Sequence, residues 1–340
     1  KEYLGQEVVP DSGCGSWLLE PQSTNLITQS ELFSDSSWVK NGFGSALAPV
    51  VTLNSDISPD GTENASRIEM DCTSTSSSDY SAIYQQLALD GSSEYTISFY
   101  IKSNTSSEQD LLFFSNSSFS TQITANSEWQ RVESTFTSNS TNTRNFGLVA
   151  RGSVQQDVDV LIYGAQLEQQ SYATSYIPTN GATNTRLQDI ATNSGNSTLI
   201  NSTEGVLYAE IAALANDSSI KTIELNDGAT NRAFIYYRNS TLRCFVIVNG
   251  TTIFSHNQTI SDVTTLHKCA LKWKENDFAF YVDGVKVDSQ SSGIVFLNNT
   301  LDNLSFNAVY SSIPFYGKTK ALAVYKEALT DEQLQSLTTI

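Results

Sequence analysis

Short runs of alternating apolar and polar residues recur along nearly the whole chain. In Glu94–Ser103, EYTISFYIKS, the residues Tyr95, Ile97, Phe99 and Ile101 all fall on one side. Side chains of a β-strand alternate between the two faces of its sheet, so this period of two predicts a strand with one buried face. Similar runs recur at intervals of about ten residues, between clusters of Ser, Asn, Gly and Asp, a rhythm typical of sandwiches and barrels. Further strands are expected at Glu128–Ser138, Asp159–Glu168 and Gly205–Leu214.

Local turn and cap signals add two elements near the end of the chain. Asp283-Gly284 divides two alternating runs within Leu271–Ser289, and an Asp-Gly pair in that context predicts a tight hairpin. Thr330 and Gln333 have the spacing of a capping box, and an apolar stripe of leucines follows them. This combination predicts a short C-terminal helix in an otherwise all-β chain.

Breaks in the pattern suggest where the chain divides. Residues 1–22 look extended and proline-interrupted, and they are interpreted as an N-terminal arm. The segment Ser175–Arg186 is rich in Pro, Gly, Asn and Thr and reads as a linker. The sequence therefore predicts two tandem β-sandwich domains of the jelly-roll type, at residues 23–180 and 181–340, with the extended arm before them and the helix after them.

Individual residues within the predicted strands have expected roles. Gly164 lies inside the strand Asp159–Glu168, where a glycine marks a bulge or a close backbone approach. Trp129 and Trp273 lie in alternating runs and are both expected in the cores.

The composition excludes several classes of partner. Lys and Arg total 19 against 36 Asp and Glu, which gives a formal net charge of -17. A nucleic-acid-binding protein needs basic side chains to replace counterions, so nucleic acid is excluded as a partner. No apolar run is long enough to predict a membrane span. The acidity is compatible with divalent cations or simply with solubility.

The four cysteines and two histidines form no zinc-binding pattern. Cys244 and Cys269 lie in apolar strand-like runs, where buried free thiols and a cross-strand disulfide are both compatible with the sequence. The pairing state of the cysteines and the redox compartment therefore stay open.

Several segments, taken in order, carry a family resemblance. In the first half these segments are Leu18–Trp38, Ser58–Ile68, EWQRV, YGAQLE and TSYIPT, and in the second half they are Ser202–Glu210, Asp277–Val287 and Ala323–Leu337. The first set resembles a carbohydrate-binding-module-like jelly roll from the C-terminal regions of bacteriophage tail fibres and virion spikes. The second set resembles a concanavalin A-like, laminin-G-type sandwich.

The resemblance implies a role on a virus particle. It implies a tail-fibre or spike protein, on the virion surface and thus extracellular, that attaches to a host-surface polysaccharide or lipopolysaccharide. Other virion proteins would hold the arm, and a homo-oligomer, most often a trimer, would display many copies. A pair of secreted bacterial polysaccharide-binding modules, a structural virion decoration protein and a glycan depolymerase are the alternatives.

The calcium site of related jelly rolls is incomplete in this sequence. Such modules resemble this chain around Phe33, but Ser34 stands where a Glu is expected, and Gly164 stands where an Asp would help. Because calcium needs several oxygen ligands, no cofactor is expected at this position. Asp217 and Asp227 of the second domain are weak alternative candidates for a structural Ca2+.

No catalytic constellation is visible. Glycan-cleaving enzymes on concanavalin-like folds usually carry two acids on one strand in an ExDxxE pattern. Glu275 and Asp277 match the first two acidic positions of this pattern, but Phe280 stands where its second Glu is required. His256 and His267 are the only histidines, and the sequence has no GxSxG motif to supply a serine nucleophile beside either of them. The protein is therefore expected not to be an enzyme, although carboxylates from distant segments leave depolymerase activity open.

Sugar recognition would need aromatic rings outside the core, with amides and carboxylates nearby. A ring stacks on the C–H face of a pyranose, and the polar groups bind its hydroxyls. Tyr236 and Tyr237 are neighbours in a strand, so one of the two should point outward. The glycan-binding candidates are Tyr80, Tyr84, Phe119, Tyr237, Asp302, Asn307, Tyr310 and Tyr316.

Overall fold

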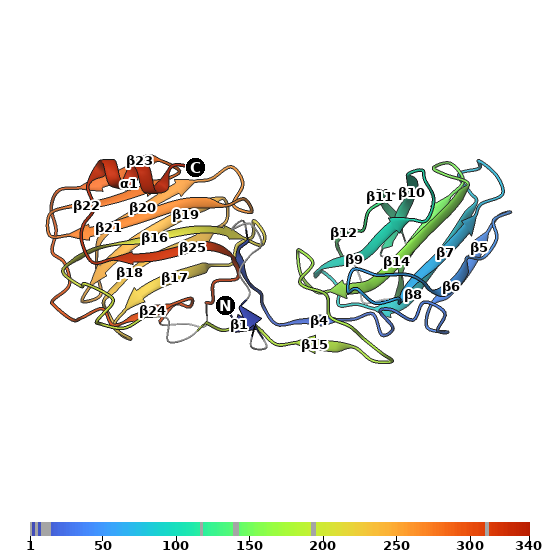
Figure 1. The fold of residues 1–340 in the computed structure, drawn as a ribbon, viewed down its shortest axis with the longest axis horizontal. Coiled ribbons are helices and arrows are strands. Elements are labelled where there is room, and N and C mark those ends of the chain that lie inside the picture. Colours follow the sequence, from blue (N-terminus) through green and yellow to red (C-terminus); the bar gives the residue numbers. More distant parts are fainter. Residues whose placement is uncertain are drawn as a thin grey trace. The chain divides into compact units, whose positions relative to one another are not determined.

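The structure is a computed structural model, and it describes residues 2–3, 6–7, 15–115, 118–138, 143–191, 195–309 and 313–340. The chain forms two compact units (Figure 1). Residues 22–187 are the first sandwich, and residues 188–340 together with 1–21 are the second sandwich. Both are built from antiparallel strands, so the all-β class with a short C-terminal helix is confirmed.

Two five-stranded sheets form the first sandwich. One sheet has the order β11-β10-β13-β8-β5 and the other β12-β9-β14-β7-β6. The strands of the first sheet are β5 (Val39–Phe43), β8 (Tyr80–Ala88), β10 (Gln109–Ser115), β11 (Ser118–Ala125) and β13 (Thr143–Arg151). Those of the second are β6 (Val50–Asp56), β7 (Ala65–Asp71), β9 (Glu94–Ser103), β12 (Gln130–Thr137) and β14 (Asp157–Glu168).

The alternation seen in the sequence builds the core of this sandwich. In β9, Tyr95, Ile97, Phe99 and Ile101 are all buried in the space between the sheets. Gly164 marks a bulge in β14, where the register against β9 shifts and the backbone takes a φ of 62°. An L-residue rarely adopts this φ, so the predicted reason for a glycine is confirmed.

The segment after β14 is part of the first sandwich and not a free linker. Ile177 is buried, and its carbonyl accepts a hydrogen bond from Asn25 Nδ2 at 2.9 Å. Further on, β15 (Asn184–Arg186) pairs with β4 (Ser23–Asn25), and the two run side by side in Figure 1. Because this pairing holds the segment, the first sandwich ends at residue 187, whereas the sequence predicted a boundary at 180.

The second sandwich packs a six-stranded sheet against a five-stranded one. Their orders are β23-β22-β21-β16-β25-β3 and β20-β19-β18-β17-β24. The six-stranded sheet consists of β3 (Trp17–Leu19), β16 (Glu204–Ala213), β21 (His267–Lys274), β22 (Phe278–Val282), β23 (Val285–Gln290) and β25 (Gly317–Tyr325). The five-stranded sheet consists of β17 (Lys221–Asn226), β18 (Arg232–Arg238), β19 (Thr241–Val248), β20 (Thr251–Thr259) and β24 (Asn303–Ser305).

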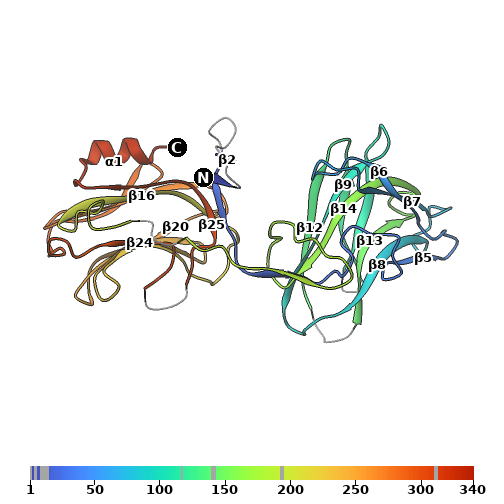
Figure 2. The same cartoon turned by 60° about the horizontal axis from the view of Figure 1, so that its bottom comes forward.

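Both local signals near the C-terminus are confirmed. Asp283 and Gly284 join β22 to β23 with φ values of 49° and 79°, as a two-residue hairpin of this type requires. Thr330 caps α1 (Asp331–Thr338) in a complete capping box with Gln333. The helix buries Leu334 against the outer face of the six-stranded sheet, which leaves the outer face of the other sheet on the opposite side of the sandwich (Figure 2).

The predicted N-terminal arm is partly built into the second sandwich. β3 pairs with β25, where Trp17, Leu18 and Leu19 lie opposite Thr319, Lys318 and Gly317. An edge strand satisfies its backbone groups by such pairing, so this part of the arm is not free. Before it, β1 (Glu2–Tyr3) and β2 (Gln6–Glu7) pair in antiparallel fashion.

The structure decides three questions that the sequence left open or misjudged. Cys72, Cys244 and Cys269 are free, buried thiols, and Cys14 lies outside the described residues. Trp273 is fully buried as expected, but Trp129 is only half-buried, because it precedes β12 and donates Nε1 to the carbonyl of Ile57 at 3.0 Å. None of the helices in the described ranges has the length and apolar character needed to cross a bilayer.

Candidate functional site

Alternation along β18 separates a core face from a solvent face of the five-stranded sheet. Ala233, Ile235 and Tyr237 are buried in the core of the second sandwich. Phe234 and Tyr236 therefore lie on the outer face. In Figure 2 the layer that contains β20 and β24 lies on the side of the sandwich away from α1, so among the described residues no helix covers this face.

Tyr237, one of the predicted glycan-binding residues, has a structural role instead. Only 1% of its surface is exposed, and its hydroxyl donates to the carbonyl of Ile211 at 3.0 Å. Burial is the main cause that raises its pKa well above the usual value. The prediction of Tyr237 as a glycan-binding residue is therefore wrong. Alternation along β18 places Tyr237 in the core with Ala233 and Ile235, and Tyr236 is the tyrosine that faces outward.

Three aromatic rings lie side by side on the outer face. Phe234 is opposite Phe245 in the β18–β19 register, and their rings stack with centroids 5.3 Å apart and an interplanar angle of 7°. Tyr236 lies 5.8 Å from Phe234 and 5.9 Å from Phe245. We call Phe234, Tyr236 and Phe245 the aromatic platform. Tyr236 and Phe245 are half-buried, so their rings remain accessible to a ligand.

Arginines surround the aromatic platform. The Arg232 guanidinium carbon lies 4.4 Å from the centroid of the Phe234 ring, and that of Arg243 lies 5.7 Å from the centroid of the Tyr236 ring. Both distances are within the range of cation–π attraction. Arg238 occupies the next outward position of β18 and is exposed. Polar, cationic and aromatic groups thus meet on one open face.

A buried carboxylate holds one of these arginines in place. Glu224 on β17 has no exposed surface, and its Oε2 accepts a hydrogen bond from Arg232 Nε at 2.8 Å. Its other oxygen accepts from the backbone N–H of Val309 at 3.2 Å. Burial raises the pKa of Glu224, and the bonds from Arg232 oppose that shift. The contact with Val309 places the loop after β24 against this side of the platform.

That loop contains several of the predicted site residues. Asn307 uses its Oδ1 to accept from the backbone N–H of Ile313 at 2.7 Å, which closes the loop. Tyr316 donates its hydroxyl to Gln188 Oε1 at 2.8 Å, and Asp302 is exposed. Tyr310 lies outside the described residues. The loop that contains Asn307 thus contacts Glu224 through Val309, while the side chains of Asn307 and Tyr316 already have partners.

Tyr80 and Tyr84, two candidates of the first sandwich, lie on the outer face of the sheet that contains β8. The Tyr80 ring stacks on Phe43, with centroids 5.1 Å apart and an interplanar angle of 10°. Tyr84 packs edge-on against Phe114 and is only 8% exposed. Tyr80 is therefore partly accessible, and Tyr84 is not. The side chain of Phe119 lies outside the described part of the structure.

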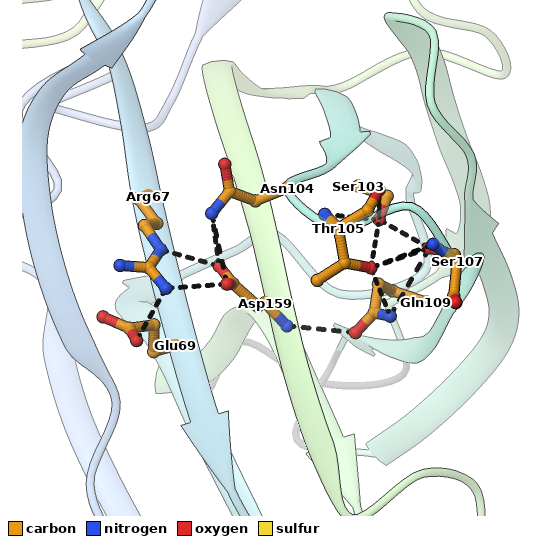
Figure 3. Close-up of polar contacts among 8 residues, drawn as sticks. All are labelled: Arg67, Glu69, Ser103, Asn104, Thr105, Ser107, Gln109 and Asp159. Carbon is orange, nitrogen blue, oxygen red and sulfur yellow. Dashed lines mark hydrogen bonds and ion pairs between the residues drawn. The ribbon is translucent and has the colours of Figure 1, made fainter.

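A polar hollow of about 530 Å3 lies at one end of the other sheet of the first sandwich. Its wall includes Asp159 (Figure 3). The carboxylate of Asp159 accepts two hydrogen bonds from the Arg67 guanidinium, from Nε at 2.8 Å and from a terminal nitrogen at 2.7 Å. It also accepts one from Asn104 Nδ2 at 3.1 Å. Gln109 Oε1 accepts from the backbone N–H of Asp159 at 3.1 Å, and Gln109 Nε2 donates to Thr105 Oγ1 at 3.1 Å. Because these groups satisfy one another, the cluster stabilises the sandwich more than it offers bonds to a ligand.

This cluster predicts how the first sandwich responds to acid. Hydrogen bonds from Arg67 are the main cause that lowers the pKa of Asp159 below its usual value. A carboxyl group with a lowered pKa adds stability above its unfolded-state pKa of about 4, and that stability is lost as the pH falls through the folded-state pKa. We expect Asp159→Asn to lower the free energy of unfolding by about 1 kcal/mol at pH 7, since the pair is partly exposed, and by less at pH 3, where the wild type has already lost part of this contribution.

Urea unfolding of the full chain at the two pH values measures this effect. Asp157→Asn is the matched control, because Asp157 lies two residues earlier on the same strand and is exposed. Its effect should not depend on pH in the same way. An equal loss of stability at pH 7 and pH 3 in Asp159→Asn would show that the carboxylate's charge has no role there.

The weak calcium candidates already use their oxygen atoms within the protein. Asp217 Oδ1 accepts from Lys221 Nζ at 2.6 Å, and Asp227 accepts from Asn231 Nδ2 at 2.7 Å. A cation at either place would have to compete with these donors, and calcium at Asp217 or Asp227 stays a prediction. Within the described residues there is no group of three or more His, Cys, Asp and Glu side chains that could hold a metal ion.

The histidines and the acids near the hairpin likewise have structural partners. His256 Nδ1 lies 3.0 Å from Asp288 Oδ2, and His267 Nδ1 lies 2.6 Å from Asp283 Oδ2. Asp277 lies 2.7 Å from the Lys272 ammonium. These contacts bind strands and turns together.

Sequence reasoning missed most of the site. Phe234, Phe245, Arg232 and Arg243 were not among the candidates. The sequence RAFIYYR nevertheless indicates them. Ala233 and Ile235 alternate on the core side of this strand, so the arginines and aromatic residues between them face the other side. The outward-facing residues of each predicted strand, and not only its core residues, therefore carry information about a binding surface.

Comparisons with known proteins do not assign the chain to a family. No family model matches the chain, and no curated protein matches it. Among solved structures, it is similar to the CBM40 module of the Ruminococcus gnavus IT-sialidase bound to α2,3-sialyllactose, with 12% identity and a TM-score of 0.36 over 44% of this chain and 97% of that one. It is also similar to mouse laminin α1 chain domains LG4-5, with 10% identity and a TM-score of 0.32 over 77% and 93% of the two chains.

Proposed function

We propose that the protein is a non-enzymatic glycan-binding protein and that the aromatic platform is its binding surface. The observation that carries this proposal is a pair of accessible rings, Tyr236 and Phe245, that pack against the largely buried ring of Phe234 on the outer face of a sheet, with arginines beside them. Large aromatic side chains normally complete a core, so accessible rings that contact one another on an outer face suit an external apolar partner. The C–H face of a pyranose is such a partner.

Polar neighbours on β20 suit the remaining surface of a sugar. In the β19–β20 register, Asn257 lies opposite Arg243 and Ser255 lies opposite Phe245. Both are exposed. An amide, a hydroxyl and a guanidinium can each hydrogen-bond a sugar hydroxyl while the ring stacks on Tyr236 or Phe245. Binding thus combines burial of the rings with several hydrogen bonds, and it needs no chemical step.

In its finer form, the proposal is attachment of a virion to a host-surface polysaccharide or lipopolysaccharide. The resemblance of the sequence to tail fibres and spikes supports this part. Single sugar contacts are weak, and many copies that bind together gain avidity. A homo-oligomer, a trimer in the expected form, anchored to other virion proteins through residues 1–22 would supply those copies on the virion surface.

Loss of the accessible rings should weaken glycan binding. In a Tyr236→Ala, Phe245→Ala double variant, we expect affinity for any glycan that the wild-type chain binds to fall at least about tenfold, because two stacking contacts are removed. A glycan array followed by isothermal titration with the best ligand measures the effect. Release of reducing ends from the same glycans would reveal depolymerase activity.

Leu297→Ala is the control for nonspecific loss of apolar surface, because Leu297 is 80% exposed on the same sandwich. It should bind like the wild type. Far-ultraviolet circular dichroism of all variants checks that the sheets persist. Full binding by the double variant, or cleavage of the glycan by the wild type, would overturn the proposal.

A further inference from the structure

Arg238 and Arg243 flank Tyr236 on the outer face, as the next outward residue of β18 and as its partner in the β18–β19 register, and within the described residues neither has an anionic partner. Within the described residues, the Arg238 guanidinium has no hydrogen-bond or ion-pair partner, and Arg243 donates only Nε, to Thr241 Oγ1 at 2.7 Å. The formal net charge is -17, so carboxylates are abundant. Lysines elsewhere on the second sandwich pair with them, as in Lys221–Asp217, Lys272–Asp277, Lys274–Glu204, Lys286–Asp331 and Lys320–Glu210.

The surroundings of the platform also lack free acids. On β18, β19 and β20, the outward positions carry arginine, aromatic, amide, hydroxyl and aliphatic side chains, and none is acidic. Glu224 on β17 is fully buried and bonded to Arg232. This face therefore carries positive charge on a strongly acidic protein, and its charge complements an anionic ligand.

The chemistry of the two arginines indicates which kind of anionic group the ligand carries. A guanidinium is planar and can make two parallel hydrogen bonds to a carboxylate. Arg243 lies against the Tyr236 ring, so a sugar stacked on that ring would place its substituents next to the guanidinium. A carboxyl group bonded directly to a ring carbon reaches this position, whereas a sulfate or phosphate ester stands one oxygen atom farther out.

We propose that the aromatic platform, together with Arg238 and Arg243, binds a carboxylated sugar, such as a unit of an acidic polysaccharide. The sugar ring stacks on Tyr236 and Phe245, and its carboxylate pairs with the two guanidinium groups. This inference rests on the proposed function, because it names the ligand class of the same surface. The rest of the chain is strongly acidic and would repel a polyanion, whereas this face combines accessible rings with two arginines that have no acidic partner within the described residues.

A panel of carboxylated polymers and their methyl esters tests the inference. The probes are polygalacturonate, alginate, hyaluronan and polysialic acid, each paired with its methyl-esterified form, with dextran as a neutral polymer and dextran sulfate as a sulfated one. We expect the full chain to bind at least one carboxylated polymer about tenfold more tightly than its ester, because esterification removes the charge-assisted hydrogen bonds. Raising the salt concentration should weaken that binding and leave ester binding unchanged.

An Arg238→Gln, Arg243→Gln double variant should lose the preference for the acid over its ester. Lys318→Gln is the matched control, since Lys318 is an exposed cation on β25 of the same sandwich, and it should keep the preference. Equal binding of acid and ester, stronger binding of dextran sulfate, or a preference unchanged in the double variant would each overturn the inference. If neutral glycans still bind through Tyr236 and Phe245, the proposed function stands without it; if nothing on the panel or the array binds, the proposed function fails first.

Discussion

Replacing Trp273 by alanine should destabilise the second sandwich by about 3–5 kcal/mol, because the change leaves a large cavity in a packed core. The ring is fully buried, and its Nε1 donates to the carbonyl of Ser202 at 3.2 Å. Gly205 lies directly beneath it, since a Cβ there would come within 2.6 Å of the ring. The neighbouring strands are therefore shaped around this one side chain.

Hydrogen exchange of the full chain, read peptide by peptide, measures the effect where it occurs. Peptides from β16, β21 and β22 should exchange faster in Trp273→Ala, and peptides from residues 22–187 should serve as internal reference. Trp17→Ala is the matched control, because Trp17 lies in the same sandwich but is 49% exposed, and it should cost about 1 kcal/mol. Similar exchange in Trp273→Ala and the wild type would mean that this core does not depend on the ring.

Replacing Glu168 by alanine should destabilise the first sandwich by about 3–5 kcal/mol, because several buried donors lose their acceptor at once. The side chain has no exposed surface. Its oxygens accept from Ser23 Oγ at 2.5 Å, Gln166 Nε2 at 2.6 Å, and Thr174 Oγ1 and backbone N–H at 2.5 and 3.0 Å. These bonds join β4, β14 and the segment that follows β14.

Thermal and urea unfolding of the full chain report this loss, with exchange of peptides from β14 as the local measure. Glu168→Gln keeps one acceptor oxygen in the same place and should cost less than Glu168→Ala. Glu128→Ala, at an exposed position of the same sandwich, should change stability by less than about 0.5 kcal/mol. A Glu168→Ala protein as stable as Glu128→Ala would exclude the network as a source of stability.

The Glu168 network also explains one of the motifs behind the family resemblance. YGAQLE ends in Glu168, and the residues that bind its carboxyl group come from TSYIPT and from the start of the first sandwich. The three segments are far apart in the sequence, so their joint role in one buried cluster could not be inferred from any of them alone. Their function in the chain is structural, and a resemblance based on them indicates the fold more than the ligand.

The site was harder to predict than the fold because its residues act through neighbours on other strands. Tyr80 was a candidate, but its partner Phe43 lies on β5 and could be paired with it only once the β5–β8 register was known. Arg243 and Tyr236 were likewise brought together by the β18–β19 register. Local patterns specify which face a side chain takes, and registers specify what it meets there.

The sequence by itself determined the all-β class, the strand at Glu94–Ser103, the Asp283-Gly284 hairpin and the capped C-terminal helix. These follow from interactions within a few residues, namely side-chain alternation, turn conformation and capping bonds. Only the tertiary structure decided that Tyr236 faces outward and that β3 belongs to the second sandwich. Those outcomes depend on contacts between segments far apart in the chain, where burial and strand pairing, and not local preference, set the lowest free energy.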